Sequence, residues 1–103
     1  MTAGRDPVAV AALQYCAAGT AEETLRTLMP LIDRAADDGA KLVCLPEAAT
    51  FLAASRAALA DEAEPAGESK VLDRLCNAAV RRGIELSIGS MFFLGPDGRH
   101  VNR

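Results

Sequence analysis

The segment Lys41-Leu42-Val43-Cys44-Leu45-Pro46-Glu47 decides how the rest of the chain is interpreted. Its residues 42–45 carry no polar side chain, and their number and composition are typical of a buried strand. Apolar residues on both faces indicate a strand that is covered on both sides, as in parallel α/β sheets. The segment therefore predicts one strand of a parallel sheet, which ends just before Glu47.

A strand and a helix are predicted on the amino-terminal side of this segment. Residues 8–14 (VAVAALQ) form another short apolar run and predict a buried strand. Thr20 with Glu23 three residues later is the pattern of a capping box at a helix start, and Gly39 is typical of a helix end. The expected buried stripe of the helix between them, at 3.6-residue spacing, is Leu25, Leu28, Met29, Ile32, Ala35 and Ala36.

Two helices and two strands are predicted on the carboxyl-terminal side. The alanine-rich residues 48–66 predict one helix, and Ser69 is expected to cap another that ends at Gly83. The expected buried stripe of this last helix is Val71, Leu72, Leu75, Cys76, Ala79 and Val80. Residues 84–94 predict a third strand, and residues 95–98 a tight turn into a fourth strand over residues 99–103. The expected order is β-α-β-α-α-β-β, which is an α/β fold.

Composition and charge exclude several classes of protein. The chain has 103 residues, a net charge of -3 and no basic cluster, which argues against nucleic-acid binding. It has no apolar run that could span a membrane and no signal peptide over residues 1–7, so a cytoplasmic location without a membrane partner is expected. Three cysteines (Cys16, Cys44 and Cys76) and one histidine (His100) are too few for a zinc site. The thiols are expected to be reduced and mostly buried, with no metal or cofactor.

Glu47 is the residue that could carry chemistry. It directly follows the apolar strand, and in open α/β sheets the carboxyl ends of the strands form the ligand crevice. A carboxylate placed there among mostly apolar neighbours is suited to act as a general base. The alternative is a glutamate near a helix start, where it interacts with the dipole of the helix that follows.

The segment ending in Leu45-Pro46-Glu47 resembles the nitrilase superfamily of carbon–nitrogen hydrolases. Further pieces resemble that family in the same order along the chain: a first strand ending in Gln14, the loop Glu64-Pro65-Ala66-Gly67, a strand closing in Gly89-Ser90, and the hairpin Asp97-Gly98-Arg99 leading to Asn102. The resemblance covers nearly all of residues 1–103 and is closest to the amidase and omega-amidase branch. It implies a partial α-β-β-α sandwich, the amino-terminal part of a single domain.

The resemblance also implies a reaction. Family members use a glutamate, a lysine and a cysteine to hydrolyse a small carboxamide to an acid and ammonia through a thioester, and Glu47 takes the place of the glutamate. The family's lysine and cysteine lie beyond Arg103, so residues 1–103 alone are expected to be inactive. The implied partners are a small amide substrate and, for the complete protein, further copies of itself.

Residues present in the chain are poor substitutes for the missing nucleophile. Cys44 lies three residues before Glu47 and is expected on the opposite face of the strand, while Cys76 falls on the apolar stripe of a helix. Cys16 is the best placed, because it follows the first strand at the same edge as Glu47. Lys41 begins its strand at the opposite end from Glu47, and Lys70 begins a helix.

The chain stops five residues into the second arm of the predicted hairpin, which indicates truncation. One alternative to an enzyme is therefore a truncated, non-catalytic paralogue that binds a partner through the unpaired edge of this hairpin. A small nucleotide-binding domain is another alternative, although the chain lacks the glycine-rich phosphate-binding motifs.

Overall fold

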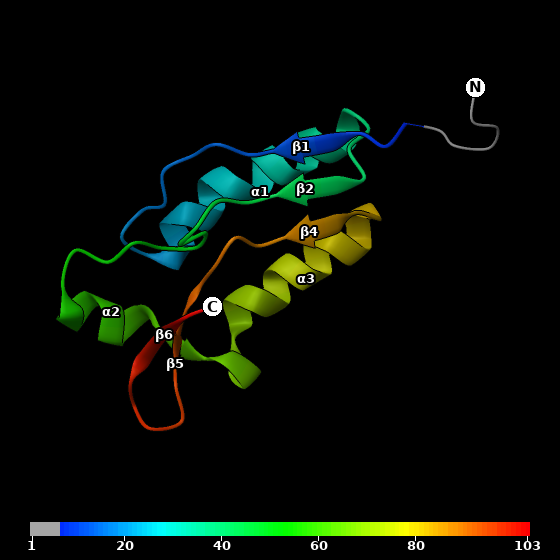
Figure 1. The fold of residues 1–103 in the computed structure, drawn as a ribbon. Coiled ribbons are helices and arrows are strands. Elements are labelled where there is room, and N and C mark those ends of the chain that lie inside the picture. The colour runs from blue at the N-terminus through cyan, green and yellow to red at the C-terminus, as the bar shows by residue number, and fades with distance from the viewer. Residues whose placement is uncertain (1–6) are drawn as a thin grey trace.

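The computed structural model describes residues 7–103 and confirms the α/β class (Figure 1). The sequence-based expectation that residues 1–7 form no signal peptide concerns mostly residues 1–6, which lie outside the described part. The elements follow in the order β1 (Val10–Ala12), α1 (Ala21–Asp37), β2 (Leu42–Cys44), α2 (Arg56–Glu62), β3 (Glu64–Pro65), the short 3-10 helix η1 (Ala66–Glu68), α3 (Lys70–Arg82), β4 (Glu85–Ser87), β5 (Phe92–Leu94) and β6 (His100–Asn102).

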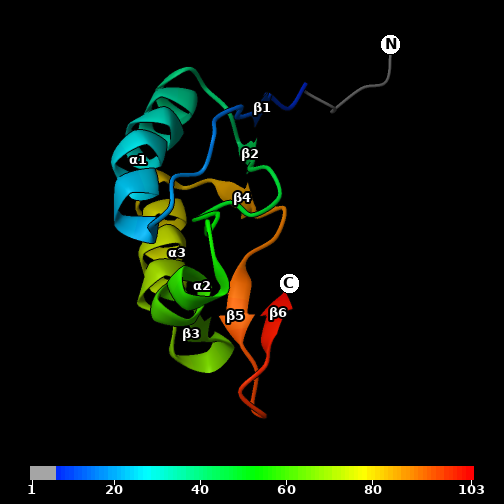
Figure 2. The same ribbon diagram turned by 90° about the vertical axis from the view of Figure 1, so that its left-hand side faces the viewer.

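The first sheet is parallel, as predicted, with the order β1-β2-β4. Helices α1 and α3 lie side by side on one face of it (Figure 2). Val43 of the central strand points into this layer and is fully buried, whereas Leu42 and Cys44 are only partly buried. The prediction of a strand covered on both faces is therefore wrong for residues 7–103, because both long helices pack against the same face.

The caps of the two long helices are confirmed. Thr20 accepts a hydrogen bond from the N–H of Glu23 at the start of α1, and Ser69 accepts one from the N–H of Leu72 at the start of α3. Gly83 ends α3 with φ 65°, a left-handed conformation that glycine adopts without steric cost. Side-chain oxygens and a glycine thus help to define these helix ends through local chemistry.

The buried stripe of α1 is confirmed, and that of α3 is confirmed in part. In α1 the residues Leu25, Leu28, Ile32 and Ala35 are buried, with Met29 and Ala36 partly buried. In α3, Leu75 is buried and Val71, Leu72 and Ala79 are partly buried and packed against the core, as predicted. Cys76 is exposed, Val80 is 82% exposed, and Ala78, which was not predicted, is buried. The apolar residues of α3 occupy a wider arc of the helix surface than the arc that is buried. Periodicity alone therefore did not show which of them face the core.

The predicted helix over residues 48–66 is wrong over most of its length. Ala48 has a positive φ of 48°, and the backbone N–H groups of Ala49 and Leu52 bind the carbonyls of Ser90 and Ala18. Amides that are tied to other segments cannot form a helical ladder, so the helix α2 is delayed until Arg56. Residues 64–65 form β3 instead of a helix end.

The predicted single strand over residues 84–94 is divided into two strands that belong to different sheets. Strand β4 completes the first sheet, while β5 lies in a second sheet of order β3-β5-β6. Residues 88–91 join the two strands, and among them Gly89 approaches the backbone of Pro46 closely. The hairpin between β5 and β6 is confirmed, with Gly98 in the left-handed region of its turn.

Candidate active site at the carboxyl ends of β1, β2 and β4

Glu47 lies just beyond the carboxyl end of the central strand β2, where the sequence predicts it. The N–H of Leu45 still pairs with the carbonyl of Ser87 in the neighbouring strand at 2.8 Å, and the chain then bends at Glu47. The Glu47 side chain is exposed, so the mostly apolar surroundings expected for it are not formed by residues 7–103. The helix-dipole alternative is wrong, because α2 begins only at Arg56.

A left-handed turn at Ala48 follows Glu47 and is held by Ser90. The Ala48 N–H donates to the Ser90 hydroxyl at 2.9 Å, and the Ala49 N–H donates to the Ser90 carbonyl, also at 2.9 Å. A non-glycine residue at φ 48° is uncommon and persists only where its surroundings fix it. Ser90, which is buried, supplies this restraint from the segment between β4 and β5.

Gly89 allows the two segments to lie this close together. A Cβ atom at this position would stand 2.6 Å from the carbonyl carbon and oxygen of Pro46 and 2.8 Å from the carbonyl oxygen of Leu45. Real Cβ atoms do not approach backbone atoms so closely, so no side chain fits here without displacing the backbone before Glu47. The Gly-Ser pair that resembles the family's third strand thus has a defined structural role beside Glu47.

Tyr15 holds the same turn from the other side of β2. It lies in the segment after β1, and its hydroxyl donates to the carbonyl of Ala49 at 2.6 Å. Burial raises the pKa of Tyr15 to about 12. Sequence reasoning missed this residue; the available signal was a tyrosine, the only one in the chain, at the same strand edge as Glu47.

The other candidate residues do not complete an active site. Cys16 and Cys76 are exposed and Cys44 is partly buried, so the expectation of mostly buried thiols is wrong. Lys41 directly precedes β2, at the end of the strand opposite Glu47, and Lys70 begins α3. Over residues 7–103, no three His, Cys, Asp or Glu side chains come together in a way that could hold a metal ion.

The family model for carbon-nitrogen hydrolases matches residues 8–101. The chain belongs to the carbon-nitrogen hydrolase family. In the crystal structure of the C. elegans NitFhit protein, a matching region with 21% sequence identity superposes on 90% of the chain with a TM-score of 0.77. The chain covers 24% of that protein, so it spans about a quarter of this structural neighbour. No curated protein matches the sequence of the chain significantly.

The two comparisons confirm the nitrilase-superfamily resemblance and the type of fold. At 21% identity the structural likeness shows the fold alone, and the match over residues 8–101 shows the family. This member of the family contains the parallel sheet with its helical layer and a second, mixed sheet. Within residues 7–103, no helix has the length and apolar character needed to cross a membrane.

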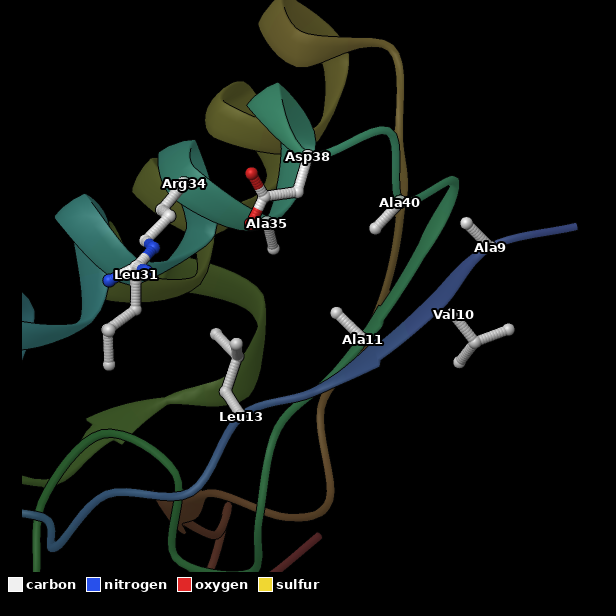
Figure 3. A pocket seen from close by; sticks show the side chains of 9 residues that line it. All are labelled: Ala9, Val10, Ala11, Leu13, Leu31, Arg34, Ala35, Asp38 and Ala40. Atoms are coloured by element: carbon white, nitrogen blue, oxygen red, sulfur yellow. The ribbon is translucent and has the colours of Figure 1, made fainter.

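A hollow of about 330 Å³ lies away from Glu47, between β1 and the second half of α1 (Figure 3). Its lining is mostly apolar, with Arg34 of α1 and Asp38, which directly follows α1, as the charged members. Val10 of β1 is 58% exposed and points away from the helix in Figure 3. The lining includes neither Glu47 nor Tyr15, so this hollow is separate from the candidate site.

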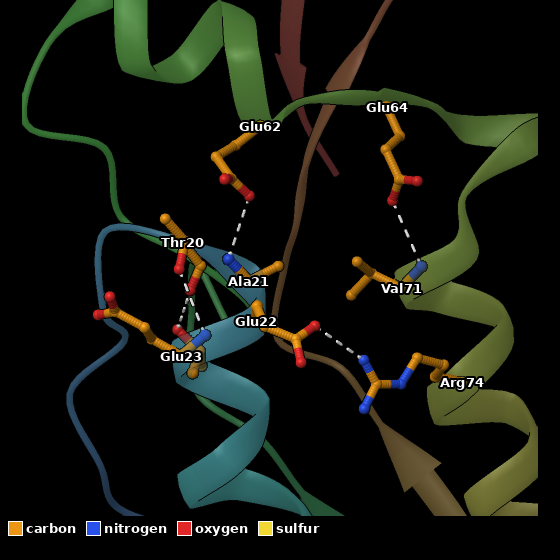
Figure 4. A network of polar contacts seen from close by, with 9 residues as sticks. Thr20, Ala21, Glu22, Glu23, Glu62, Glu64, Val71 and Arg74 are labelled. Atoms are coloured by element: carbon orange, nitrogen blue, oxygen red, sulfur yellow. Dashed lines mark hydrogen bonds and ion pairs between the residues drawn. The ribbon is translucent and has the colours of Figure 1, made fainter.

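Glu64 is a second carboxylate in a family-like loop, and its role is structural. It accepts hydrogen bonds from the Ser69 hydroxyl at 2.9 Å and from the N–H of Lys70 at 3.1 Å. It also accepts one from the N–H of Val71 at 3.3 Å (Figure 4). These donors lie at the start of α3, where N–H groups lack partners within the helix. Glu64 therefore caps α3 and is engaged there.

Proposed function

We propose that the chain supplies the general base, Glu47, of a carbon–nitrogen hydrolase that converts a small carboxamide to an acid and ammonia. The observation that carries this proposal is the turn after Glu47. Ser90 binds two of its backbone N–H groups and Tyr15 binds one of its carbonyls, from opposite sides of β2. Rigid placement of a carboxylate at the carboxyl edge of a parallel sheet is what a general base requires.

The proposed reaction is covalent catalysis. Glu47 takes the proton of a cysteine thiol, the thiolate attacks the amide carbon, and a lysine stabilises the negative charge that develops on the amide oxygen. Transfer of the proton from Glu47 to the departing nitrogen releases ammonia and leaves a thioester. Glu47 then removes a proton from water as the water attacks the thioester, and the acid is released with the thiol restored.

The nucleophile and the lysine are proposed to belong to a longer protein, in the part that follows Arg103. The resemblance places both residues there, and the exposure of Glu47 supports the idea that further structure covers it. The same resemblance supports a substrate of the amidase or omega-amidase type. It also supports self-assembly of the complete protein. The net charge of -3 and the absence of a basic cluster and of a long apolar run support a cytoplasmic setting without a nucleic-acid or membrane partner.

The test is ammonia release from small carboxamides by the complete protein and by its Glu47→Gln variant. Loss of a general base lowers the rate about 10²- to 10⁴-fold, so we expect a fall of this size in kcat. Glu68→Gln changes an exposed glutamate in η1 and serves as the matched control, with unchanged kcat. Equal kcat in the Glu47→Gln variant and the wild type would refute the proposal, as would hydrolysis by residues 1–103 alone.

A second candidate function is a binding module without catalysis. It is favoured by β6, which lies at the edge of the second sheet with one side of its backbone unpaired by β5. Such an edge can pair with a strand of another chain. Light scattering of residues 1–103 checks this alternative, and a monomer over a wide concentration range would count against it. Concentration-dependent association that Asn102→Pro abolishes would support it, because the N–H of Asn102 lies on the side of β6 that does not pair with β5.

A further inference from the structure

We propose that Tyr15 is a positioning residue for Glu47, because its hydroxyl holds the backbone turn that sets the direction of the Glu47 carboxylate. The inference rests on the proposed role of Glu47 as the general base. Tyr15 does not contact the reacting groups in this proposal and acts only through the peptide group of Ala49.

The backbone of Ala49 is bound on both of its polar groups. Its carbonyl accepts from the Tyr15 hydroxyl at 2.6 Å, and its N–H donates to the carbonyl of Ser90 at 2.9 Å. The Ala49 side chain is fully buried, so this residue has little freedom to move. Because β2 lies between β1 and β4, the two restraints come from opposite sides of the strand that ends before Glu47.

The position of these restraints explains why they act on Glu47. Ala48 stands between Glu47 and Ala49 and adopts a left-handed conformation that L-residues rarely occupy. Such a conformation persists only where neighbouring contacts over-determine it. If the contact from Tyr15 is lost, the turn is held by Ser90 alone, and the backbone at Ala48 can relax toward commoner conformations that turn the Glu47 carboxylate away.

The environment of Tyr15 suits a permanent donor. Partial burial raises the pKa of its hydroxyl to about 12, so the group keeps its proton throughout the physiological range. A protonated phenol can donate to the Ala49 carbonyl, and the neighbouring exposed Cys16 does not offer a comparable buried donor. The restraint is therefore constant throughout the physiological pH range.

The first experiment measures amide hydrogen exchange in residues 1–103, without any requirement for catalysis. Tyr15→Phe keeps the ring and removes the hydroxyl. We expect exchange at Ala48 and Ala49 to accelerate about tenfold or more, while exchange at Val43 in the centre of β2 stays unchanged. Unchanged exchange at Ala48 and Ala49 would overturn the inference, and so would an equal acceleration at Val43, which would indicate a general loss of stability.

The second experiment measures kinetics of the complete protein on a small carboxamide. We expect Tyr15→Phe to lower kcat about tenfold with KM unchanged, because a displaced base affects the chemical step more than substrate binding. Val80→Ala, at a highly exposed position on α3, is the control with unchanged kcat and KM. A normal kcat in Tyr15→Phe, beside an inactive Glu47→Gln, would overturn the inference and leave the role of Glu47 standing.

The two proposals can fail separately. If the complete wild-type protein releases no ammonia from carboxamides, the proposed function fails. If exchange then shows no change at Ala48 and Ala49 in the Tyr15→Phe variant, the positioning role fails as well, on structural grounds of its own. If exchange accelerates while kcat stays normal, Tyr15 holds the turn but does not position Glu47, and the inference is wrong.

Discussion

The hydroxyl of Ser90 accepts a hydrogen bond from the backbone N–H of Ala48 at 2.9 Å, and this contact joins the segment after β4 to the turn after Glu47. The carbonyl of the same serine binds the N–H of Ala49. Ser90 thus binds the N–H groups of two consecutive residues. These N–H groups are then not available for the helix that the alanine-rich composition predicts. The Ala48 and Ala49 amides bind Ser90 and do not form helical hydrogen bonds. These contacts keep the backbone after Glu47 out of a helix and hold it in place.

Ser90→Ala is expected to lower the free energy of unfolding by about 1 kcal/mol, because the N–H of Ala48 loses its acceptor. Ser87→Ala is the matched control. Its side chain is exposed in β4, and the backbone carbonyl that binds Leu45 remains, so we expect a change within about 0.5 kcal/mol. Urea denaturation measures both values; equal losses in the two variants would contradict the role assigned to Ser90.

Gly89→Ala tests the close approach between the bend after β4 and the backbone before Glu47. The added methyl group would meet the Pro46 carbonyl at 2.6 Å, and backbone cannot yield as a flexible side chain can. We expect a loss of about 1–3 kcal/mol in the free energy of unfolding, the usual cost of overpacking.

Gly67→Ala is the control for this substitution, since a methyl group at Gly67 meets nothing within 4 Å. Thermal unfolding should then separate the two variants by several degrees, because about 1 kcal/mol shifts the midpoint of a domain of this size by roughly 4–8 °C. An unchanged midpoint in Gly89→Ala would mean that the two segments are not in contact.

Features of the fold that depend on local chemistry could be predicted from the sequence. The helix caps at Thr20 and Ser69 and the helix end at Gly83 follow from side-chain and backbone preferences within a few residues. The parallel strand 42–44 was predictable because its apolar run has few other interpretations. These are the parts in which near neighbours in the sequence decide the conformation.

Features that depend on contacts between distant segments could not be predicted. Nothing near Gly89 in the sequence shows that its Cα lies against the Pro46 carbonyl, which is why one strand was expected where two are found. The same holds for the candidate site. The position of Glu47 at a strand end was predictable from its own segment, whereas the hydrogen bond from Tyr15 joins residues 34 positions apart.

Glu64→Ala is expected to destabilise the chain by about 1–2 kcal/mol, because three donors at the start of α3 lose their acceptor. Glu68→Ala removes an exposed glutamate from the adjoining helix η1 and should change the free energy of unfolding by no more than about 0.5 kcal/mol. In circular dichroism, the helical signal of Glu64→Ala should be lost at a lower denaturant concentration than that of Glu68→Ala. Identical denaturation midpoints for both variants would show that Glu64 is not a cap.

The raised pKa of Tyr15 predicts how stability depends on pH in the alkaline range. Below pH 10.0, the ordinary pKa of a tyrosine, the hydroxyl is protonated in both the folded and the unfolded chain and adds no slope. Between pH 10.0 and about 12 the unfolded chain releases this proton while the folded chain keeps it. The folded state then binds more protons, so the free energy of unfolding falls as the pH rises.

Tyr15→Phe isolates this contribution from the other groups that titrate at high pH. The difference in unfolding free energy between wild type and variant should be constant up to pH 10.0 and should shrink above it, because only the wild type has the hydroxyl to lose. Phenolate absorbance gives an independent reading, since the chain has one tyrosine and no tryptophan. A midpoint near the ordinary value in the folded chain would show that the hydroxyl is solvated and does not bind the Ala49 carbonyl, and the restraint on the turn after Glu47 would have to come from Ser90 alone.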